Sequence, residues 1–446
     1  MISEKVESLI HLRFSGNTRN AELEEKLKDI DLHANSQFFL WHTWFSDVFN
    51  RADDCNGFDI VIGNPPYVFA RKADFSTEFK KIVEKTYFSN LSSGKKSKAN
   101  QSGKINLFAL FILLGINLTK KSGAISYIIP NNILRTTTYD IIRKAILDKT
   151  SINQIVDLGS GIFAKVTAST IILQLQKEQN KENEVSTITD VENLLKKKYT
   201  LNKIPQKQFE KNTSYAFNIF CDDKNIELTQ RIANGKTAFG EFCVDIIAGI
   251  DANKSLISDT KNKNNEPLII GKVVKRYLIQ EITKFIEWIP EKINRTRPAY
   301  LWKEEKKIVT QRISGGSHPI VAAIDVEKRK AFASTNSIVL KDDYKHLYNY
   351  FLALLNSNVL NWYYANNFSN NSTLTVNISK TFLEQLSIPT ATKKEQAPII
   401  NLVEQILKVK KENPANDTSE LEKQIDKLVY ELYKLSPEEI AIIENS

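Results

Sequence analysis

The chain has 446 residues and a net charge of +9, with 61 lysines and arginines against 52 aspartates and glutamates. This length suits two or three domains with cores of their own, and the basic balance favours a polyanionic partner, although a lysine excess is also common on ordinary surfaces. Residues 107–116 form the longest apolar stretch, which is too short to span a bilayer, so the composition excludes a membrane-embedded protein.

The cysteines and histidines show no metal-ligand spacing. Cys55, Cys221 and Cys243 are scattered along the chain, and none has a neighbouring histidine. We therefore expect no metal site, and thiols that are buried or idle in a reducing compartment. Because the charged amino terminus lacks the apolar core of a signal peptide, we expect a soluble, cytoplasmic protein.

The first part of the chain predicts alternating strands and helices. An amphipathic helix is expected over residues 21–30, and aromatic residues cluster between 38 and 49. The further predicted elements are a short buried strand (58–62), a buried helix (105–119), a strand (124–129), an amphipathic helix (138–147) and two strands (152–158 and 169–175). We expect the last two strands to form an antiparallel edge of one sheet.

The residues best suited to bind a ligand lie directly after the strand predicted at 58–62. Open α/β sheets bind their ligands past the carboxyl ends of their strands, and here a glycine and two prolines build a rigid turn at that place. Asn64 offers an amide oxygen, Pro65 offers a carbonyl that Pro66 keeps pointing outward, and Tyr67 offers a flat aromatic face. Two fixed acceptors beside an aromatic wall suit a planar ring that carries an amino group.

Asn64-Pro65-Pro66-Tyr67 after such a strand resembles the catalytic loop of adenine-specific DNA methyltransferases, which use S-adenosylmethionine. The surrounding sequence resembles the large restriction-modification methylases. The resemblance implies that a target adenine swings out of the duplex, that Asn64 and the Pro65 carbonyl hold its amino group, and that Tyr67 and Phe163 stack on its two faces. The amine would then attack the methyl group without a general base of unusual pKa.

A second motif, Asp157-Leu158-Gly159-Ser160-Gly161, imitates the loop that binds the methyl donor. A donor loop must open a helix, whose amino terminus faces the ligand, but the residues that follow are β-branched and alternate as in a strand. The family carries its donor motif ahead of the catalytic loop, and residues 1–57 hold no glycine-rich loop after a strand. The S-adenosylmethionine site is therefore expected to be incomplete in this chain: either a second polypeptide supplies the donor half, or the gene is a remnant.

The expected fold class is α/β. We predict a partial class I, Rossmann-like methyltransferase sheet that lacks its first strands, followed by an α+β target-recognition domain and carboxyl-terminal helices. The predicted boundaries are a methyltransferase domain (1–178), a charged linker (179–199), a target-recognition domain (200–390) and a helical region (391–446). Ser436 to Glu439 form a capping box with Pro437 at the first helical position, which predicts a last short helix through Ile443.

Double-stranded DNA is the expected partner, and a nuclease could accompany it. The stretch 71–104 is either a solvated loop or a mobile catalytic loop whose lysines meet phosphates. Across residues 200–446 the chain resembles the family's target-recognition region, in which an arginine can bridge guanine acceptors and a lysine more readily meets phosphate. For each basic residue an ordinary exposed side chain is the alternative. The candidates for DNA contact are Lys95, Lys96, Lys98, Lys275, Arg276 and Arg312.

Three functions remain open from the sequence. The favoured one is part of an adenine-specific DNA methyltransferase. A DNA-binding specificity subunit without catalysis shares every feature except a working donor site. Methylation of a protein glutamine amide, which related enzymes perform with the same tetrapeptide, fits the long basic carboxyl-terminal region poorly.

Overall fold

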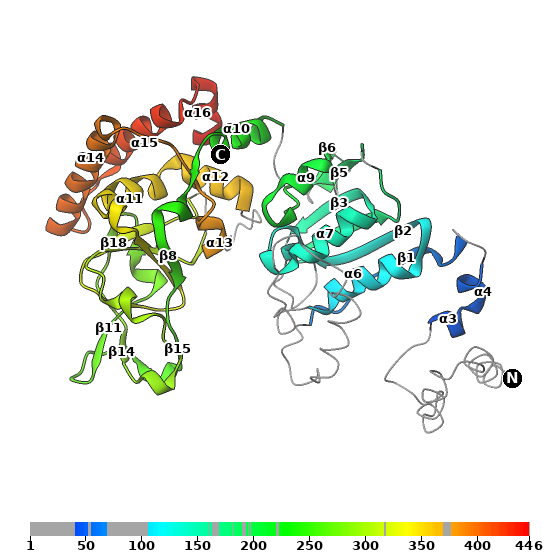
Figure 1. Ribbon diagram of the computed structural model, residues 1–446, viewed down its shortest axis with the longest axis horizontal. Coiled ribbons are helices and arrows are strands. Elements are labelled where there is room, and N and C mark those ends of the chain that lie inside the picture. Colours follow the sequence, from blue (N-terminus) through cyan, green and yellow to red (C-terminus); the bar gives the residue numbers. More distant parts are fainter. Residues whose placement is uncertain are drawn as a thin grey trace. The chain divides into compact units, whose positions relative to one another are not determined.

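The protein consists of two compact units, residues 1–219 and 220–446, in a computed structural model (Figure 1). Each unit is considered by itself below. The structure describes the following residues: 41–51, 55–68, 106–159, 161–162, 169–180, 182–189, 193–194, 196, 198–219, 223–315, 318–368 and 376–445. The predicted helix over 21–30 lies outside them.

The first unit is built on one mixed sheet of six strands, in the order β1-β2-β4-β3-β5-β6. The strands are β1 (Phe58–Gly63), β2 (Thr119–Pro130), β3 (Ser151–Gly159), β4 (Thr170–Gln176), β5 (Glu184–Ile188) and β6 (Asn202–Pro205). The helices are α3 (Trp41–Trp44), α4 (Ser46–Phe49), α6 (Leu107–Leu118), α7 (Asp140–Lys149) and α9 (Lys207–Lys211). Each element predicted between residues 58 and 175 is confirmed, with ends shifted by a few residues.

The pairing directions place three strand ends at one edge of the sheet. β1 runs parallel to β2, while β4 is antiparallel to both β2 and β3, so β1, β2 and β3 all point the same way. The antiparallel strand β4 therefore lies inside the described sheet and not at its edge, which β5 and β6 form instead. The chain leaves β1, β2 and β3 at the same edge, which we call the carboxyl edge.

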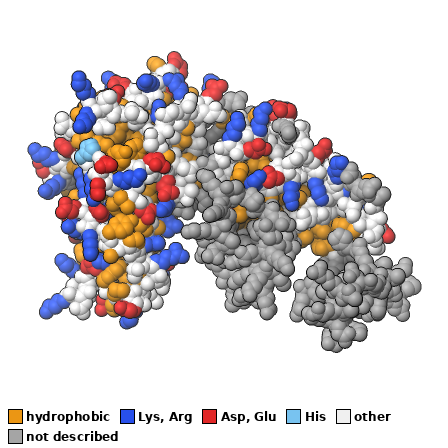
Figure 2. All heavy atoms as spheres, viewed as in Figure 1, with side chains coloured by type: hydrophobic (Ala, Val, Ile, Leu, Met, Phe, Trp, Pro, Cys, Tyr) orange, Lys and Arg blue, Asp and Glu red, His pale blue; other side chains and the backbone are white. Residues whose placement is uncertain are grey.

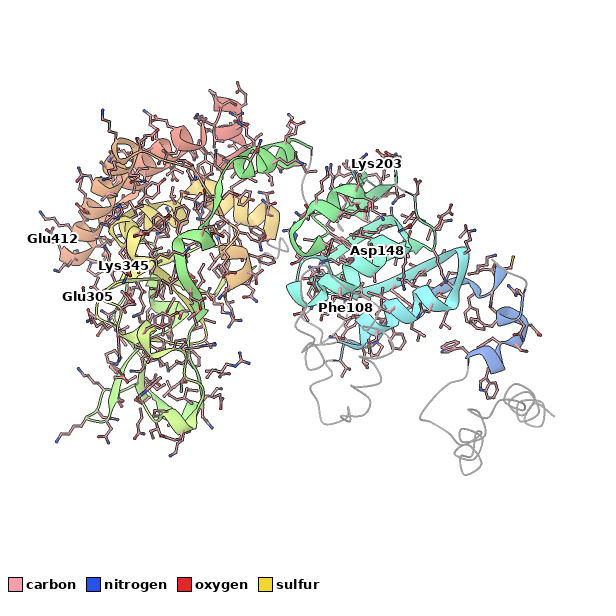
Figure 3. The ribbon with its side chains drawn as sticks, viewed as in Figure 1. Phe108, Asp148, Lys203, Glu305, Lys345 and Glu412 are labelled. Atoms are coloured by element: carbon pink, nitrogen blue, oxygen red, sulfur yellow. The ribbon has the colours of Figure 1, made fainter. Side chains whose placement is uncertain are left out.

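One face of the sheet is covered by α6 and α7, and Tyr127 of β2 joins α6 to the sheet. A Cβ added at Gly115 of α6 would lie 2.6 Å from the Tyr127 hydroxyl oxygen, and one at Gly63 would lie 3.4 Å from its ring. Burial raises the pKa of Tyr127 to about 12. Phe108, labelled on α6 in Figure 3, is fully buried in this layer. Gly63, which the sequence placed in the turn after the strand, therefore makes room for the Tyr127 ring within the parallel pair.

The opposite face is open at β1. Because side chains alternate along a strand, Ile60 and Ile62 point away from the α6 face that Gly63 shares with Tyr127. Their side chains are 66% and 78% exposed. Parallel strands are normally covered on both faces. The prediction of a buried strand at 58–62 is therefore wrong for the described residues, although the parallel pairing is right.

A buried arginine holds the loops beside the carboxyl edge. Arg143 of α7 is 0% exposed and donates to the carbonyls of Ile133 (2.7 Å), Thr136 (3.0 Å), Ser214 (2.7 Å) and Tyr215 (3.1 Å). Ser214 and Tyr215 both have positive φ angles, 54° and 55°, which side chains rarely adopt. Burial lowers the pKa of Arg143 to about 9, against the opposing charge of a nearby aspartate. The guanidinium thus stabilises two strained residues that follow the sheet.

The predicted linker over residues 179–199 is corrected by β5 and β6. β5 pairs in parallel with β3, and β6 pairs with β5, so the sheet continues through the charged segment. Gln206 fixes this extension: its side chain accepts from the Ile152 amide at 2.7 Å and donates to the Thr150 carbonyl at 3.0 Å. The charged run misled the prediction because β5 alternates between exposed and buried residues, so polar side chains still fit a strand.

The second unit contains a four-stranded antiparallel sheet, β18-β16-β20-β8, and several smaller ladders. Its strands include β7 (Thr237–Ala238), β8 (Cys243–Ala248), β9 (Asp251–Ala252), β10 (Ile257–Ser258), β11 (Asn265–Ile269), β12 (Val274–Lys275), β13 (Leu278–Ile279), β14 (Phe285–Glu287), β15 (Ile293–Arg295), β16 (Lys307–Gln311), β17 (Ile313–Ser314), β18 (Ala322–Asp325), β19 (Lys330–Ala331), β20 (Thr335–Leu340), β21 (Val376–Asn377) and β22 (Ser387–Ile388). Its helices include α10 (Asp223–Ala233), α11 (Tyr348–Asn356), α12 (Asn358–Phe368), α13 (Lys380–Leu383), α14 (Lys393–Glu412), α15 (Ser419–Tyr433) and α16 (Pro437–Glu444).

The carboxyl-terminal helices share their core with the rest of this unit. Ile399 and Val403 of α14 and Val429 of α15 belong to the same buried cluster as Leu352 of α11 and Ile338 of β20. The region predicted as separate over 391–446 is therefore an integral part of the second unit. The capping box predicted at the start of α16 is confirmed.

A polar network ties α15 to the start of α12. Asp426 accepts the Asn358 amide hydrogen at 2.8 Å, and the Asn358 side chain contacts His318 at 2.8 Å and Tyr430 at 3.2 Å. Arg276 lies close enough to favour the charged carboxylate. Burial nevertheless dominates and raises the pKa of Asp426 to about 6.

Replacing Arg143 by methionine should destabilise the first unit by about 3 kcal/mol, because several buried carbonyls lose their donor. Hydrogen exchange in increasing urea would measure this, since peptides from each unit can be followed separately. The control is Lys144→Met on the same helix, which removes a part-exposed ion pair to Asp148 and a contact of the ammonium group with the Tyr215 ring, and should cost about 1 kcal/mol or less. Equal effects of the two substitutions would contradict the role given to Arg143.

Asp426→Asn should stabilise the second unit at neutral pH, and less so in acid. The pKa of Asp426 is higher in the folded chain than in the unfolded one, so the protonated carboxyl stabilises the folded second unit. This stabilisation is lost as the pH rises through about 6. The advantage of the variant in urea denaturation should shrink by roughly 1 kcal/mol between about pH 7.5 and pH 5. Asp417→Asn should show no pH dependence over this range, because the Ser419 amide lowers the pKa of Asp417 and its carboxylate stays ionised in both the folded and the unfolded chain above about pH 5. A pH-independent difference for Asp426→Asn would refute the assignment.

Candidate functional site

The predicted catalytic tetrapeptide lies at the carboxyl edge, directly after β1. Asn64 and Pro66 are exposed, Pro65 is buried and Tyr67 is half-buried. The corner is therefore open to solvent among the described residues, and packed side chains do not bury it. A planar ring could approach the Asn64 amide and the Tyr67 face from outside.

Two hydrogen bonds fix the exit of this loop. The Tyr67 hydroxyl donates to the Ile128 carbonyl of β2 at 3.0 Å, and burial raises the pKa of Tyr67, so the phenol stays a donor. The Leu107 amide donates to the Val68 carbonyl at 2.9 Å, which ties the loop to the first turn of α6. The Tyr67 ring is thus held against the parallel pair, as a stacking wall requires.

The segment Asn106 to Phe108, at the head of α6, lies beside this loop. Asn106 is 2% exposed and caps α6, with its side-chain oxygen 3.4 Å from the Phe108 amide. Because Leu107 contacts Val68, the cap is adjacent to the catalytic tetrapeptide in space. The role of Asn106 that the structure supports is that of a helix cap that positions the loop.

The end of β2 adds polar groups that the sequence prediction did not single out as functional. The Asn131 amide donates to the Ser169 carbonyl at 2.9 Å, which joins the ends of β2 and β4. The side-chain oxygens of Asn132 and Thr170 are buried without a hydrogen-bond partner among the described residues. Asn132 lies just past the end of β2, the neighbour of β1, and this place was the available signal, whereas Thr170 is the first residue of β4.

The structure places Asp157-Leu158-Gly159 at the end of β3, where Asp157 pairs with Ile171 and Gly159 with Thr170 of the antiparallel strand β4. The Asp157 carboxylate accepts the Gly159 amide at 3.1 Å, and burial raises the pKa of this carboxylate. Residue 160 and residues 163–168, which follow this motif, lie outside the described residues, so the expectation that the motif does not bind S-adenosylmethionine stays a prediction.

The predicted DNA contacts are only partly within the described residues. Phe163 and the lysines at positions 95, 96 and 98 lie outside them. Lys275 is exposed on β12. Arg276 instead forms an ion pair with Glu422 of α15, at 2.7 Å and 2.8 Å, so contact with DNA would compete with this pair. Arg312 is half-buried between β16 and β17, and its role stays a prediction.

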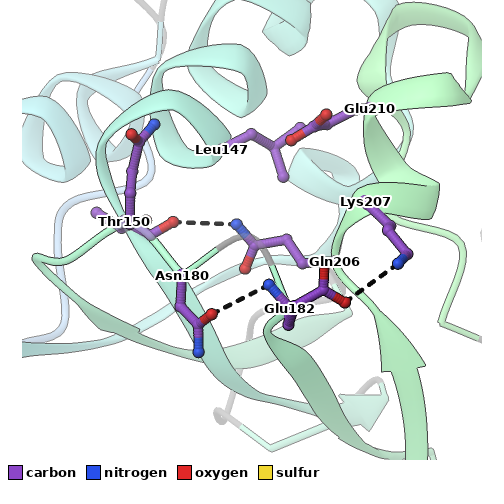
Figure 4. A pocket seen from close by; sticks show the side chains of 8 residues that line it. Leu147, Thr150, Asn180, Glu182, Gln206, Lys207 and Glu210 are labelled. Carbon is purple, nitrogen blue, oxygen red and sulfur yellow. Dashed lines mark hydrogen bonds and ion pairs between the residues drawn. The ribbon is translucent and has the colours of Figure 1, made fainter.

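A pocket of about 350 Å³ lies at the other end of the sheet, away from the carboxyl edge (Figure 4). Thr150, which lines it, directly precedes the first residue of β3. Glu182 and Lys207 form an ion pair of 3.3 Å across it. Because the strands run away from this pocket toward Asn64, it is separate from the candidate catalytic corner.

Two searches of the described residues gave negative results. They contain no cluster of three or more histidine, cysteine or carboxylate side chains placed to hold a metal ion. None of their helices is long and apolar enough to cross a membrane. Cys243 is buried, and Cys55 is exposed.

Two family models match this chain. Residues 4–163 match the Eco57I restriction-modification methylase model, which includes the catalytic tetrapeptide and the carboxyl edge. Residues 266–388 match the TaqI-like C-terminal specificity domain, which lies within the second unit.

Curated relatives are longer than this chain. The restriction enzyme and methyltransferase RM.MjaORFECS2P of Methanocaldococcus jannaschii is 25% identical over 399 residues, which are 84% of this chain and 31% of the relative. The type II restriction enzyme and methyltransferase RM.Eco57I of Escherichia coli is 27% identical over 124 residues, 28% of this chain and 11% of the relative. The chain thus spans a third or less of the length of these relatives.

Solved structures agree on the fold. The Type IIL restriction-modification enzyme MmeI, solved in complex with DNA, superposes with a TM-score of 0.60 and 12% identity over 94% of this chain and 61% of that one. The DrdV–DNA complex gives a TM-score of 0.52 with 11% identity, over 79% of this chain and 44% of that one. Residues 4–163 of the chain are thus similar to the Eco57I restriction-modification methylases, and residues 266–388 are similar to the TaqI-like C-terminal specificity domain.

Proposed function

We propose that this chain grips the target base and recognises the DNA in an adenine-specific DNA methyltransferase of a restriction-modification system. The observation that carries the proposal is the open corner at the end of β1. There Asn64 is exposed and the Tyr67 ring is held by its hydrogen bond to the Ile128 carbonyl. The match of residues 266–388 to a specificity domain supports a DNA substrate.

This corner would contribute to the reaction by holding the target base in position. The amino nitrogen of adenine is unreachable inside a duplex, so the base must leave the stack. The Asn64 side-chain oxygen and the Pro65 carbonyl would each accept one amino hydrogen, while Tyr67 stacks on the ring. Both acceptors become more favourable as positive charge develops on the nitrogen, which stabilises the transition state more than the ground state. Phe163 as the second stacking wall remains a prediction.

The methyl donor in this proposal is S-adenosylmethionine, which supplies an electrophilic methyl group. We propose that another part of the enzyme carries the donor-binding site, pairs with the edge strand β1 to continue the parallel sheet, and covers the open face of that strand. Ile60 and Ile62 are the exposed apolar side chains on that face, and covering both would stabilise the assembly by roughly 3–6 kcal/mol.

A DNA-binding specificity subunit without catalysis is the second candidate. It is favoured by the match of residues 266–388 to a specificity domain. Labelled donor and DNA, mixed with the chain with and without the product of the neighbouring upstream gene, separate the two candidates. In either case we expect the protein to act in the cytoplasm, together with an associated nuclease if the system restricts DNA.

Asn64→Ala should abolish methylation, by about 100-fold or more, because one fixed acceptor for the amino group is lost. DNA affinity, measured by fluorescence anisotropy, should change by less than about twofold, since base contacts of one residue contribute little beside phosphate contacts. Asn202→Ala, an exposed asparagine on β6 of the same sheet, is the control and should leave both quantities unchanged. Loss of DNA binding together with activity in Asn64→Ala would argue against the assigned role.

Ile62→Lys should prevent the donor-binding part from docking without unfolding the chain. The Ile62 side chain is 78% exposed, so its replacement should change the free energy of unfolding by no more than about 0.5 kcal/mol. Association with the upstream gene product, followed by calorimetry, should weaken by about 10-fold or more. Val326→Lys is the control, since Val326 is 62% exposed in the second unit. Unaltered association of Ile62→Lys would remove this face from the docking surface.

A further inference from the structure

The arginines of the second unit divide into two sets. Arg231, Arg276 and Arg329 each form an ion pair with a glutamate or aspartate. No carboxylate among the described residues lies within ion-pair distance of the remaining three, which are Arg295, Arg297 and Arg312. These three, which we call the arginine cluster, lie in the part that matches the TaqI-like specificity domain.

Arg297 is held in an unusual backbone conformation. Its φ angle is 70°, in the left-handed region, and it precedes Pro298, which further restricts its backbone. Its Nε donates to the Gly249 carbonyl at 3.0 Å. Gly249 itself lies so close to the neighbouring chain that an added Cβ would be 2.1 Å from the Phe332 carbonyl oxygen. The guanidinium is thus anchored on a tightly packed segment.

Arg312 is anchored on the same segment from the other side. Its backbone amide donates to the Ser334 carbonyl at 2.9 Å, and its Nη1 lies 3.4 Å from the Ala333 carbonyl. The Gly249 amide donates to the Thr335 carbonyl at 2.9 Å. Residues 333–335 therefore connect Arg312 directly to the glycine that holds Arg297.

Arg295 completes the cluster from β15. It pairs with Asp251 of β9, two residues after Gly249, and its side chain is exposed. Burial lowers the pKa of the Arg297 guanidinium, and the charges of Arg295 and Arg312 lower it further, whereas Asp251 acts in the opposite direction. Two segments of the chain, one with Arg295 and Arg297 and the other with Arg312, thus bring like charges together near Asp251.

Such an arrangement is unfavourable in the isolated protein. Like charges repel, and a left-handed arginine costs about 1 kcal/mol or more. An anion bound to these arginines would supply the negative charge that offsets the repulsion and the backbone strain. Bulk charge does not identify the place, because acidic and basic side chains are intermixed over the visible face of this unit in Figure 2.

We propose that Arg295, Arg297 and Arg312 bind the phosphate backbone of duplex DNA. The inference rests on the proposed function for its ligand and names the surface of the specificity domain that DNA meets. A planar guanidinium can donate two parallel hydrogen bonds to a phosphate, and three together match a run of phosphates along a strand. The role is to position the duplex, while base reading falls to other residues.

The test compares two double variants of equal charge change in the full chain. Arg297→Gln with Arg312→Gln removes two members of the cluster, whereas Arg231→Gln with Arg329→Gln removes two paired arginines of the same unit. Binding to a labelled duplex of mixed sequence is measured by fluorescence anisotropy at several salt concentrations. The cluster variant should bind about 10- to 100-fold more weakly, and its slope of log Kd against log salt should fall by about 2. The control pair should keep the wild-type slope.

Arg297→Lys with Arg312→Lys distinguishes phosphate contact from base reading and from misfolding. Lysine meets a phosphate as a point charge, so the salt slope should return to near the wild-type value. A slope that stays low in the lysine variant, or equal losses in the cluster and control pairs, would overturn the inference. DNA binding that depends on the cluster, without methylation under any condition, would support it while refuting the proposed function. Methylation with unaltered binding by the cluster variant would do the reverse.

Discussion

The parallel pairing of β1 with β2 is the constraint on which the candidate site depends. It is held by the Tyr127 ring, which packs over Gly63 on one side and reaches Gly115 of α6 on the other. A larger side chain at Gly115 would push α6 away from the sheet, because a Cβ there would overlap the Tyr127 hydroxyl. With this packing in place, β1 and β2 end side by side, and the Tyr67 hydroxyl can reach the Ile128 carbonyl. The geometry of the catalytic corner is therefore a consequence of close packing beneath it.

Helices cover one face of the described sheet, and the other face is open at β1. α6 and α7 cover the face of Tyr127, whereas Ile60 and Ile62 are exposed on the opposite side of β1. An open face on a parallel pair is unusual, since such strands are normally covered by helices on both sides. The open face of β1 is thus the part of the described sheet that lacks the usual covering layer.

The basic residues of the second unit differ in whether a nearby carboxylate neutralises their charge. Some are neutralised locally, as in the pair of Lys307 and Asp325, whose side chains are both fully buried and lie 2.6 Å apart. Such pairs hold the fold and are unavailable to a ligand. Arg297 and Arg312 differ because backbone carbonyls hold them and no carboxylate neutralises them. Charge that is positioned but not neutralised is what a polyanion requires.

Local pattern by itself determined the strands and helices from residue 58 to 175, the tetrapeptide at Asn64 and the capping box at Ser436, because each depends on residues a few positions apart. The β-branched residues after the Asp157 motif also favour a strand over a donor loop, which stays a prediction. Tertiary structure alone decided that Ile60 and Ile62 are exposed, that β5 and β6 extend the sheet through a charged segment, and that the last helices share the core of the second unit. It also decided that Arg276 pairs with Glu422 while Arg297 joins Arg312. These outcomes depend on which distant segments meet, and neither periodicity nor residue type encodes the partner of a charge more than a hundred positions away.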